Sequence, residues 1–376
     1  MKEILVVSIG FSPNLGGIET HFDDLVKALD DRGWKTWVLT YMPITTKVKA
    51  KLYEKRGNNI KILRVPWFGN LFYKLVGNPI LEFIYLVPGL FFALPFFLLV
   101  KGKNIKVIDS HGLIAGFISV FWGKIFSKRI ITTTHSIYNF PKRGFYRNFS
   151  FWIFNNSNKV LTLSKQSRKE ILELGIPENK INVFKYWIDL NKFQEIKNAK
   201  KILSWDDNFT VLFVGRLVPE KGIIELLSAA SMWNKKIELR LAGGGPLENE
   251  IRKMAKKYRN IFYLGAISQH ELPKYYSAAD LLIVPSVSEE GFGRVILESL
   301  ACETPVLGSN RGAIPEAMDS TVGKLIDISP DTIKESVEYF YSNPRELNKL
   351  SKNARKYALK NFSENNIRQI MDSFDK

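Results

Sequence analysis

Short apolar runs alternate with amphipathic helical patterns along nearly the whole chain, and the alternation starts twice. In the first half, the strand-like runs are 4–9, 34–41, 105–112, 129–136 and 158–164. After about residue 190, the runs are 209–217, 237–245, 261–267, 280–286 and 304–310. Strands that alternate with helices form parallel sheets covered by helices on both faces. The sequence therefore predicts an α/β protein built from two Rossmann-like, doubly wound domains.

The length of 376 residues agrees with two domains, because a single hydrophobic core rarely serves so long a chain. A polar stretch at 192–201 is the expected linker. We therefore place an N-terminal domain at 1–195 and a C-terminal domain at 196–360. A final helix at about 361–376 is expected to pack back on the N-terminal domain.

The net charge of +17 is concentrated in the first half, where residues 1–196 carry 28 Lys and Arg against 14 Asp and Glu. This imbalance indicates an anionic partner, such as nucleic acid, an acidic membrane surface or a phosphorylated acceptor. A solvated, lysine-rich surface is the alternative. The single cysteine, Cys302, excludes an internal disulfide framework and favours a reducing compartment, so we expect a cytoplasmic protein. The segment 1–10 lacks the features of a signal peptide.

Two cations follow the strand-like run 209–214. Arg216 and Lys221 would lie just past the carboxyl end of that strand, the edge where ligands bind in open parallel sheets. A guanidinium and an ammonium group suit a diphosphate, and they can stabilise a phosphate leaving group in place of a divalent metal. From spacing alone, two solvated loop cations are an equal alternative.

Two carboxylates surround the start of a later helix. Glu290 precedes a helix expected to begin near Gly293, and Glu298 lies inside that helix. Eight residues at helical rise span roughly 12 Å, which is comparable to the distance from the ribose to the sugar of a nucleotide-sugar. The helix N-terminus would offer amide donors to a phosphate. Without a family context, two surface glutamates are the simpler interpretation.

Glycine-rich loops and two histidines complete the candidate set. Gly16 and Gly17 follow the first strand, and Gly243 opens the corresponding loop of the second half; tight turns are the alternative. His111 and His135 each follow a strand, where they could orient a sugar hydroxyl or assist proton transfer, or could be structural. No metal-ligand spacing links them and no D-x-D occurs, so no metal site is predicted.

Together, these motifs closely resemble the family 4 glycosyltransferases, which have the GT-B fold. The matching segments are GGIE at 16–19, DSHG at 109–112, TTTHS at 132–136, GRLVPEKG at 215–222, LAGGGP at 241–246, EEGFGRVILESLA at 289–301 and GAIPEAM at 312–318. The resemblance implies two Rossmann-like domains that face a central cleft. It also implies transfer of a sugar from a nucleotide-diphosphate sugar with retention of anomeric configuration, without a metal or other cofactor.

The resemblance assigns roles to individual residues. Arg216 and Lys221 would neutralise the diphosphate, and Glu298 would bind the ribose hydroxyls. Glu290, with the backbone of Phe292 and Gly293, would contact the donor sugar. Gly16 and Gly17 would close over the diphosphate, and Gly243 belongs to the donor-binding set. His111 would lie near the anomeric carbon and the acceptor. No protein nucleophile is expected.

Two segments depart from the family pattern. The chain reads YWID at 186–189, where the family commonly has an Asn-Gly turn, so we expect Tyr186 and Trp187 to contact a different acceptor. Glu303 replaces a usual glycine, and we expect it in a loop near the donor. Neither the sugar nor the nucleotide base, uracil or guanine, follows from these residues.

An uncharged apolar run at 83–100 passes the length test for a membrane-spanning helix. It lies between Gly16–Gly17 and His111, which must reach one site, so a single crossing would separate them. Pro88, Gly89 and Pro95 are also expected to interrupt the helix. A buried crossover helix or a helix lying in the membrane interface remains, and we favour the second.

Aromatic and cationic residues near this run support peripheral binding to an anionic membrane. The acceptor or membrane set is His135, Phe91, Phe92, Phe96, Phe97, Lys101 and Lys103, and other aromatic and basic residues, Phe72, Tyr73 and Lys74 among them, precede the run. The function predicted is glycosyl transfer to a lipid-linked or saccharide acceptor at the inner face of the cell membrane. A nucleotide-sugar epimerase and a non-enzymatic nucleic-acid-binding protein are the alternatives; we expect no nucleic-acid partner.

Overall fold

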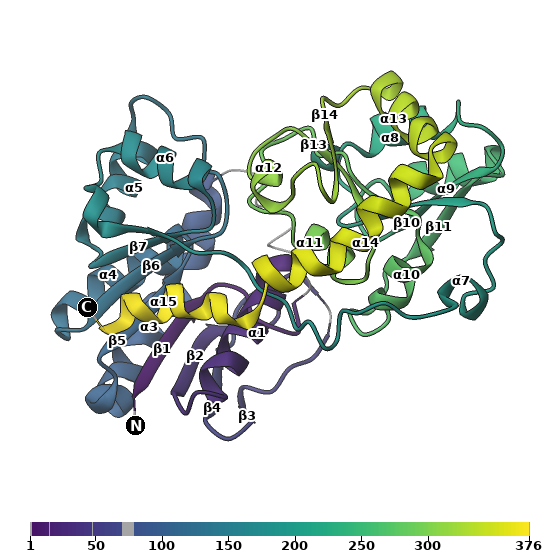
Figure 1. Ribbon diagram of the computed structural model, residues 1–376. Coiled ribbons are helices and arrows are strands. Elements are labelled where there is room, and N and C mark those ends of the chain that lie inside the picture. The colour runs from purple at the N-terminus through teal and green to yellow at the C-terminus, as the bar shows by residue number, and fades with distance from the viewer. Residues whose placement is uncertain (1, 15, 47, 70–78, 376) are drawn as a thin grey trace. The chain divides into compact units, whose positions relative to one another are not determined.

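The computed structural model describes residues 2–14, 16–46, 48–69 and 79–375. Phe72, Tyr73 and Lys74, from the expected membrane-binding half, lie outside the described residues. The chain forms two compact units, residues 1–186 with 364–376, and residues 187–363. In Figure 1, helix α14 (Pro344–Asn361) of the second unit is followed by α15 (Ile367–Asp375), the last helix of the chain, which belongs to the first unit.

The first unit contains an eight-stranded sheet in the order β3-β4-β2-β1-β5-β6-β7-β8. Its strands are β1 (Glu3–Ser8), β2 (Lys35–Tyr41), β3 (Tyr53–Arg56), β4 (Ile60–Val65), β5 (Val107–His111), β6 (Arg129–Thr134), β7 (Lys159–Thr162) and β8 (Ile181–Val183). Only β3 runs antiparallel to its neighbour among these strands. Parallel neighbours require crossovers, which helices supply.

The helices of the first unit cover both faces of its sheet. They are α1 (Gly17–Asp30), α3 (Pro79–Lys101), α4 (Leu113–Ile125), α5 (Phe145–Asn156), α6 (Lys165–Leu174) and α15 (Ile367–Asp375). Alternate strand residues point to opposite faces. Leu5 and Val7 of β1 accordingly join the core under α3 and α4, whereas Val6 packs with Phe22 of α1.

Helix α3 is the crossover between β4 and β5, two strands of the same sheet. It is the one described helical segment long and apolar enough to cross a membrane: within Leu81–Asn104, the most apolar 18 residues have a mean hydropathy of 2.4. The expected interruption at Pro88, Gly89 and Pro95 is wrong, because the helix continues through both prolines.

The side chain of Tyr41 is inserted into the backbone hydrogen bonding of α3 in this stretch. Its hydroxyl donates to the carbonyl of Leu86 at 2.6 Å and accepts from the amide of Leu90 at 2.8 Å. A regular helix would join these two backbone groups to each other. Gly89 makes room for the insertion, because a Cβ there would lie 2.5 Å from Tyr41 Cε1 and 2.7 Å from Trp67 Cε3.

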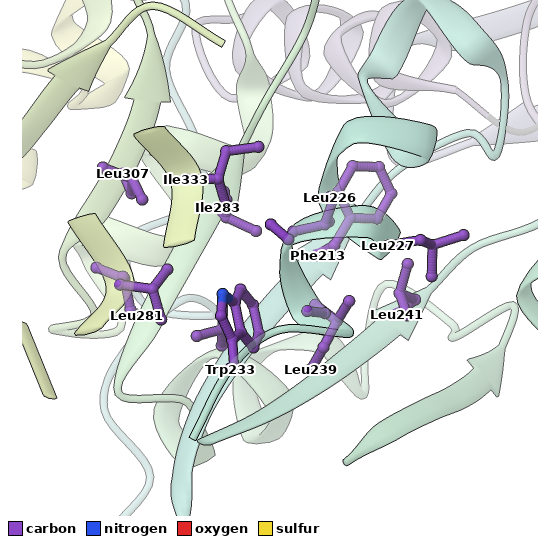
Figure 2. Packing of buried hydrophobic residues seen from close by; sticks show 14 of the residues in the cluster. Phe213, Leu226, Leu227, Trp233, Leu239, Leu241, Leu281, Ile283, Leu307 and Ile333 are labelled. Carbon is purple, nitrogen blue, oxygen red and sulfur yellow. The ribbon is translucent and has the colours of Figure 1, made fainter. Parts of the chain in front are cut away.

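The second unit has a six-stranded, fully parallel sheet in the order β11-β10-β9-β12-β13-β14. Its strands are β9 (Phe209–Val214), β10 (Ile237–Ala242), β11 (Ile261–Gly265), β12 (Leu281–Val284), β13 (Val306–Ser309) and β14 (Gly323–Ile326). Its helices are α7 (Ala199–Ile202), α8 (Ile223–Ala230), α9 (Glu248–Lys257), α10 (Leu272–Ala278), α11 (Arg294–Ala301), α12 (Ile314–Ala317), α13 (Pro330–Ser342) and α14 (Pro344–Asn361). Figure 2 shows Leu226 of α8 and Ile333 of α13 packed with Phe213, Leu239 and Leu281 of the sheet.

The two units divide at Tyr186/Trp187, nine residues before the boundary expected at 195/196. Side chains of the second unit hold the intervening segment. Arg355 donates to the carbonyls of Leu190, at 2.8 Å, and Phe193. A linker defined by composition misses such contacts, because backbone carbonyls carry no sequence signal.

The C-terminal helix α15 packs on the first unit. Asn366 donates to the carbonyl of Tyr186 at 3.1 Å, and the amide of Lys185 donates to Gln369 at 2.8 Å. Phe374 meets Trp34 edge-on with 5.6 Å between ring centroids. The helix therefore covers the first sheet with buried apolar side chains on one side of α15.

Candidate active site

Loops at the carboxyl edge of the second sheet contact one another through their backbones. Gly243 follows β10 with a φ of +145°, and a Cβ there would lie 1.8 Å from the carbonyl oxygen of Gly215. The amide of Leu217 donates to the carbonyl of Gly244 at 3.0 Å. Only glycine permits this approach, so the loop after β10 packs directly on the backbone of the loop that carries Arg216.

Lys221 and Glu290 form an ion pair at this edge. Lys221 Nζ lies 2.6 Å from Glu290 Oε2, and the side chains are 22% and 13% exposed. Ser286 also donates to Glu290 Oε2 at 3.3 Å. Arg216 follows the same strand as Lys221 and is exposed. The pair places a cation and a largely buried carboxylate side by side, and Arg216 lies on the same loop as Lys221.

The backbone of Glu290 is held by the loop after β13. The amide of Ala313 donates to the Glu290 carbonyl at 2.9 Å. Gly312, with a φ of +56°, approaches so closely that a Cβ there would lie 2.4 Å from the Glu290 amide nitrogen. The carboxylate is thus positioned by two loops of the second sheet.

Helix α11 begins at Arg294, directly after the left-handed Gly293. The residues from Glu290 to Gly293 are therefore not helical, and the estimate of 12 Å from helical rise alone does not apply. Glu298 is 3% exposed; its Oε1 accepts from Arg294 Nε at 3.0 Å and its Oε2 from the Tyr276 hydroxyl at 2.9 Å. The carboxylate expected at the ribose is thus a buried acceptor with both oxygens engaged.

The carboxyl edge of the first sheet holds a buried chain of polar side chains. His111 ends β5 in register with Ser8 of β1. Its Nδ1 lies 2.8 Å from His135 Nε2, and His135 Nδ1 lies 2.8 Å from the Tyr186 hydroxyl. His111 Nε2 lies 3.2 Å from Asp109 Oδ2, a contact too bent to be a good hydrogen bond. Thr133 donates to the other Asp109 oxygen at 2.9 Å.

One arrangement of protons fits both 2.8 Å contacts and the nearby Asp109 carboxylate. The Asp109 carboxylate can only accept, so the proton of His111 belongs on Nε2 and its Nδ1 accepts from His135. His135 Nδ1 then accepts from the hydroxyl of Tyr186. Burial, and next the neighbouring His111, hold the pKa of His135 well below its usual value, so this ring is neutral.

Two glycosyltransferase family descriptions together match nearly the whole chain. Residues 15–192 match the family described as Glycosyltransferase Family 4, and residues 194–357 match Glycosyl transferases group 1. The chain is a family 4-like glycosyltransferase.

Relatives and solved structures agree with this assignment. An uncharacterised glycosyltransferase of Methanocaldococcus jannaschii is 26% identical over 96% of each chain. The gpi3 subunit of the Schizosaccharomyces pombe phosphatidylinositol N-acetylglucosaminyltransferase is 23% identical over 88% of this chain and 71% of its own. Sucrose-phosphate synthase from Thermosynechococcus elongatus superimposes with a TM-score of 0.84, at 21% identity, over 99% and 98% of the two chains. The fold class is confirmed as GT-B, with two Rossmann-like domains.

Within this glycosyltransferase, the predicted site residues fall into two sets. Those on the second unit share the carboxyl edge of its sheet: Arg216, Lys221, Gly243, Glu290, Phe292, Gly293 and Glu298. Those on the first unit, Gly16, Gly17, His111 and His135, share the corresponding edge of the other sheet. Phe292 is buried at 3% exposure, so only its backbone can serve a ligand. The roles assigned by resemblance stay predictions.

Three expectations need correction. Tyr186 and Trp187 are 4% and 2% exposed, so in this structure they are internal side chains and do not face an acceptor. Glu303 follows the C-terminal end of α11 and precedes β13, which places it at the opposite sheet edge from the donor loops. Phe97 is 6% exposed and packs on Trp37 with 5.3 Å between ring centroids, so it faces the core and not a membrane.

Five residues of these networks were not among the predicted site residues: Asp109, Thr133, Tyr276, Ser286 and Arg294. Arg294 and Glu298 are four residues apart on one helix, a spacing that could have indicated the ion pair. Asp109 and His111 alternate on one strand, which places them on the same side of the sheet. Tyr276 and Ser286 had no local signal.

Proposed function

We propose that this enzyme transfers a sugar from a UDP- or GDP-linked donor to a lipid-linked or saccharide acceptor, with retention of configuration and without a metal. The Lys221–Glu290 pair, with Arg216 on the same loop as Lys221, carries this proposal. An incoming diphosphate would replace Glu290 as the partner of Lys221. Glu290 would then be free to accept hydrogen bonds from the hydroxyls of the donor sugar.

The reaction breaks the bond between the anomeric carbon and the phosphate oxygen and forms a bond from that carbon to the acceptor oxygen. Attack on the face from which the phosphate departs retains configuration. The departing phosphate oxygen takes the acceptor proton, so no protein base or nucleophile is required. Arg216 and Lys221 stabilise the charge that develops on the diphosphate, and preorganised cations are effective in this role.

His111 has a different part in this proposal. Its Nδ1 lies 2.8 Å from His135 Nε2 and its Nε2 lies 3.2 Å from Asp109 Oδ2, so its orientation is set from within the first unit. We assign it a place beside the acceptor and the anomeric carbon. The loop at Gly16 and Gly17 supplies backbone donors, since α1 begins at Gly17.

Relatives support the acceptor and donor classes. A Mycolicibacterium smegmatis relative, 25% identical over 56% of this chain, is named as a GDP-mannose-dependent phosphatidylinositol monomannoside mannosyltransferase. HepE of Anabaena, which has a TM-score of 0.77, was solved with UDP-glucose. These names favour a nucleotide-sugar donor and a lipid-borne acceptor, which we place on the cytoplasmic face of the cell membrane.

A thermal-shift panel of UDP- and GDP-sugars, with and without EDTA, tests the donor half. A ligand that binds only the folded protein raises the Tm in proportion to its affinity and concentration. We expect a shift with one nucleotide series, unchanged by EDTA, and loss of that shift in Lys221→Ala. The matched control is Lys236→Ala, an exposed lysine before β10 at the opposite sheet edge.

Two outcomes contradict the proposal. No shift with any donor at millimolar concentration removes the nucleotide-sugar assignment. Conversion of the donor to its epimer in the absence of acceptor identifies an epimerase in place of a transferase.

A further inference from the structure

Helix α3 is apolar on two opposite sides. Leu86, Leu90 and Leu94 are fully buried in the core of the first unit. A second row, spaced three, four or eight residues apart, is exposed: Leu81, Ile84, Phe92, Phe96 and Leu99, at 53–70%. A helix in a water-soluble protein normally turns polar residues to that side. The exposed row therefore needs a partner that accepts apolar side chains.

Helices α4 and α5 extend this apolar surface. Phe91 of α3 lies 5.1 Å from Phe121 of α4, and Phe117 of α4 lies 6.0 Å from Trp152 of α5, measured between ring centroids. The exposed large apolar side chains of α4 and α5 on this side are Phe121 at 39%, Ile125 at 61%, Phe145 at 75% and Trp152 at 39%. We name this surface, with the exposed row of α3, the three-helix face.

The segment that carries the three-helix face, residues 79–156, is mostly positive in charge. Residues 79–156 contain nine Lys and Arg against two acidic residues, Glu82 and Asp109. Asp109 is fully buried, so Glu82 is the one acidic residue of this range that is not, and burial raises its pKa. Lys101 and Lys103 adjoin the end of α3, and Lys128 after α4 donates to the carbonyl of Gly102 at 2.7 Å. The ends of α3 and α4 thus share one cluster of lysines.

We propose that the three-helix face is a membrane-docking surface that binds anionic lipid. Exposed aromatic and aliphatic side chains can enter the interface while lysines meet anionic headgroups. A second copy of the chain is a poor occupant, because it would bring two such cation clusters together. Strand β4 precedes α3 and strand β5 follows it, and both strands lie in one sheet. The helix therefore lies along the bilayer and does not cross it. This inference deepens the membrane-borne acceptor of the proposed function.

Co-sedimentation with vesicles tests the docking surface without donor or acceptor. We expect the protein to bind equimolar phosphatidylcholine–phosphatidylglycerol vesicles and to bind pure phosphatidylcholine weakly. The double substitution Phe92→Ser/Phe96→Ser should lower the partition coefficient at least tenfold. Lys101→Glu/Lys103→Glu should lower binding to the anionic vesicles about 100-fold and leave the weak phosphatidylcholine binding unchanged.

Matched controls lie on the second unit. Ile224→Ser/Met232→Ser removes exposed apolar side chains, and Lys235→Glu/Lys236→Glu reverses exposed lysines. Both should bind vesicles as the wild type does. An unchanged Tm shows that each variant is folded.

Four results overturn the inference. The first is that the wild type does not bind anionic vesicles, and the second is that the face variants bind as well as their controls. The third is that detergent but not carbonate releases the protein from membranes. The fourth is that the protein forms a lipid-free dimer, which Phe92→Ser/Phe96→Ser dissociates. Vesicle binding with no donor-induced thermal shift would leave the docking surface standing and remove the proposed function. A donor-induced thermal shift without vesicle binding would leave the proposed function standing and remove the docking surface.

Discussion

Gly243→Ala should damage the donor loops of the second unit, whereas Gly244→Ala should not. A Cβ at Gly243 would lie 1.8 Å from the carbonyl oxygen of Gly215, and the backbone there has a φ of +145°. At Gly244 the nearest atom to a Cβ is Glu248 Oε1, at 3.5 Å, which is an ordinary contact. The two neighbouring glycines therefore form a matched pair.

The cost at Gly243 has two parts. An L-residue in such a backbone conformation costs about 1–3 kcal/mol. The overlap with a backbone carbonyl cannot be relieved by a rotamer change, and overpacking adds about 1–3 kcal/mol. For a unit of this size, each kcal/mol lowers the Tm by about 2–4 °C, so a cost of about 3 kcal/mol lowers it by about 6–12 °C.

The loop that must move carries Arg216, so donor binding should suffer as well. Differential scanning calorimetry gives the Tm, and titration with the donor found in the thermal-shift panel gives the affinity. We expect at least a tenfold loss of affinity for Gly243→Ala and less than a twofold change for Gly244→Ala. Equal Tm values and equal affinities for the two variants would refute the close backbone contact between Gly243 and Gly215.

Three further predictions concern other networks. Glu290→Gln should keep the Tm within about 2 °C, because the ion pair is partly exposed, while transfer activity in a radiolabelled donor assay falls at least tenfold; full activity would remove Glu290 from the sugar site. Tyr186→Phe should lower the free energy of unfolding by about 1 kcal/mol in urea titrations, because His135 Nδ1 loses its donor; an unchanged value would show that water replaces the hydroxyl. The depressed pKa of His135 means that the unfolded chain binds a proton below about pH 6.5 that the folded chain does not, so stability should fall on acidification by up to about 1.4 kcal/mol per pH unit. His135→Asn should reduce that slope between pH 7 and pH 5, and an identical slope would exclude His135 as its source.

The alternation of strands and helices was readable from the sequence because burial on both faces makes parallel strands continuously apolar. The runs at 209–217 and 237–245 became β9 and β10, with Arg216 and Gly243 in the loops at their carboxyl ends. Strands β3 and β4 were not predicted, since they carry Glu54, Arg56 and Arg64. Arg64 is 2% exposed and pairs with Glu54 at 2.8 Å, a partner that only the folded sheet supplies.

The positions of the loop residues relative to the strands follow from the sequence alone, because the loop after a parallel strand lies at the ligand-binding edge of the sheet. The tertiary structure decided which side chains meet. Asp109, His111 and His135 come from two neighbouring strands, and Tyr186 follows a third, so their chain of contacts depends on sheet order and register. The exposure of the apolar run 83–100 also depends on the tertiary structure, because its hydropathy is uniform around the helix. Only packing against the first sheet buried one side of that helix and left the other exposed.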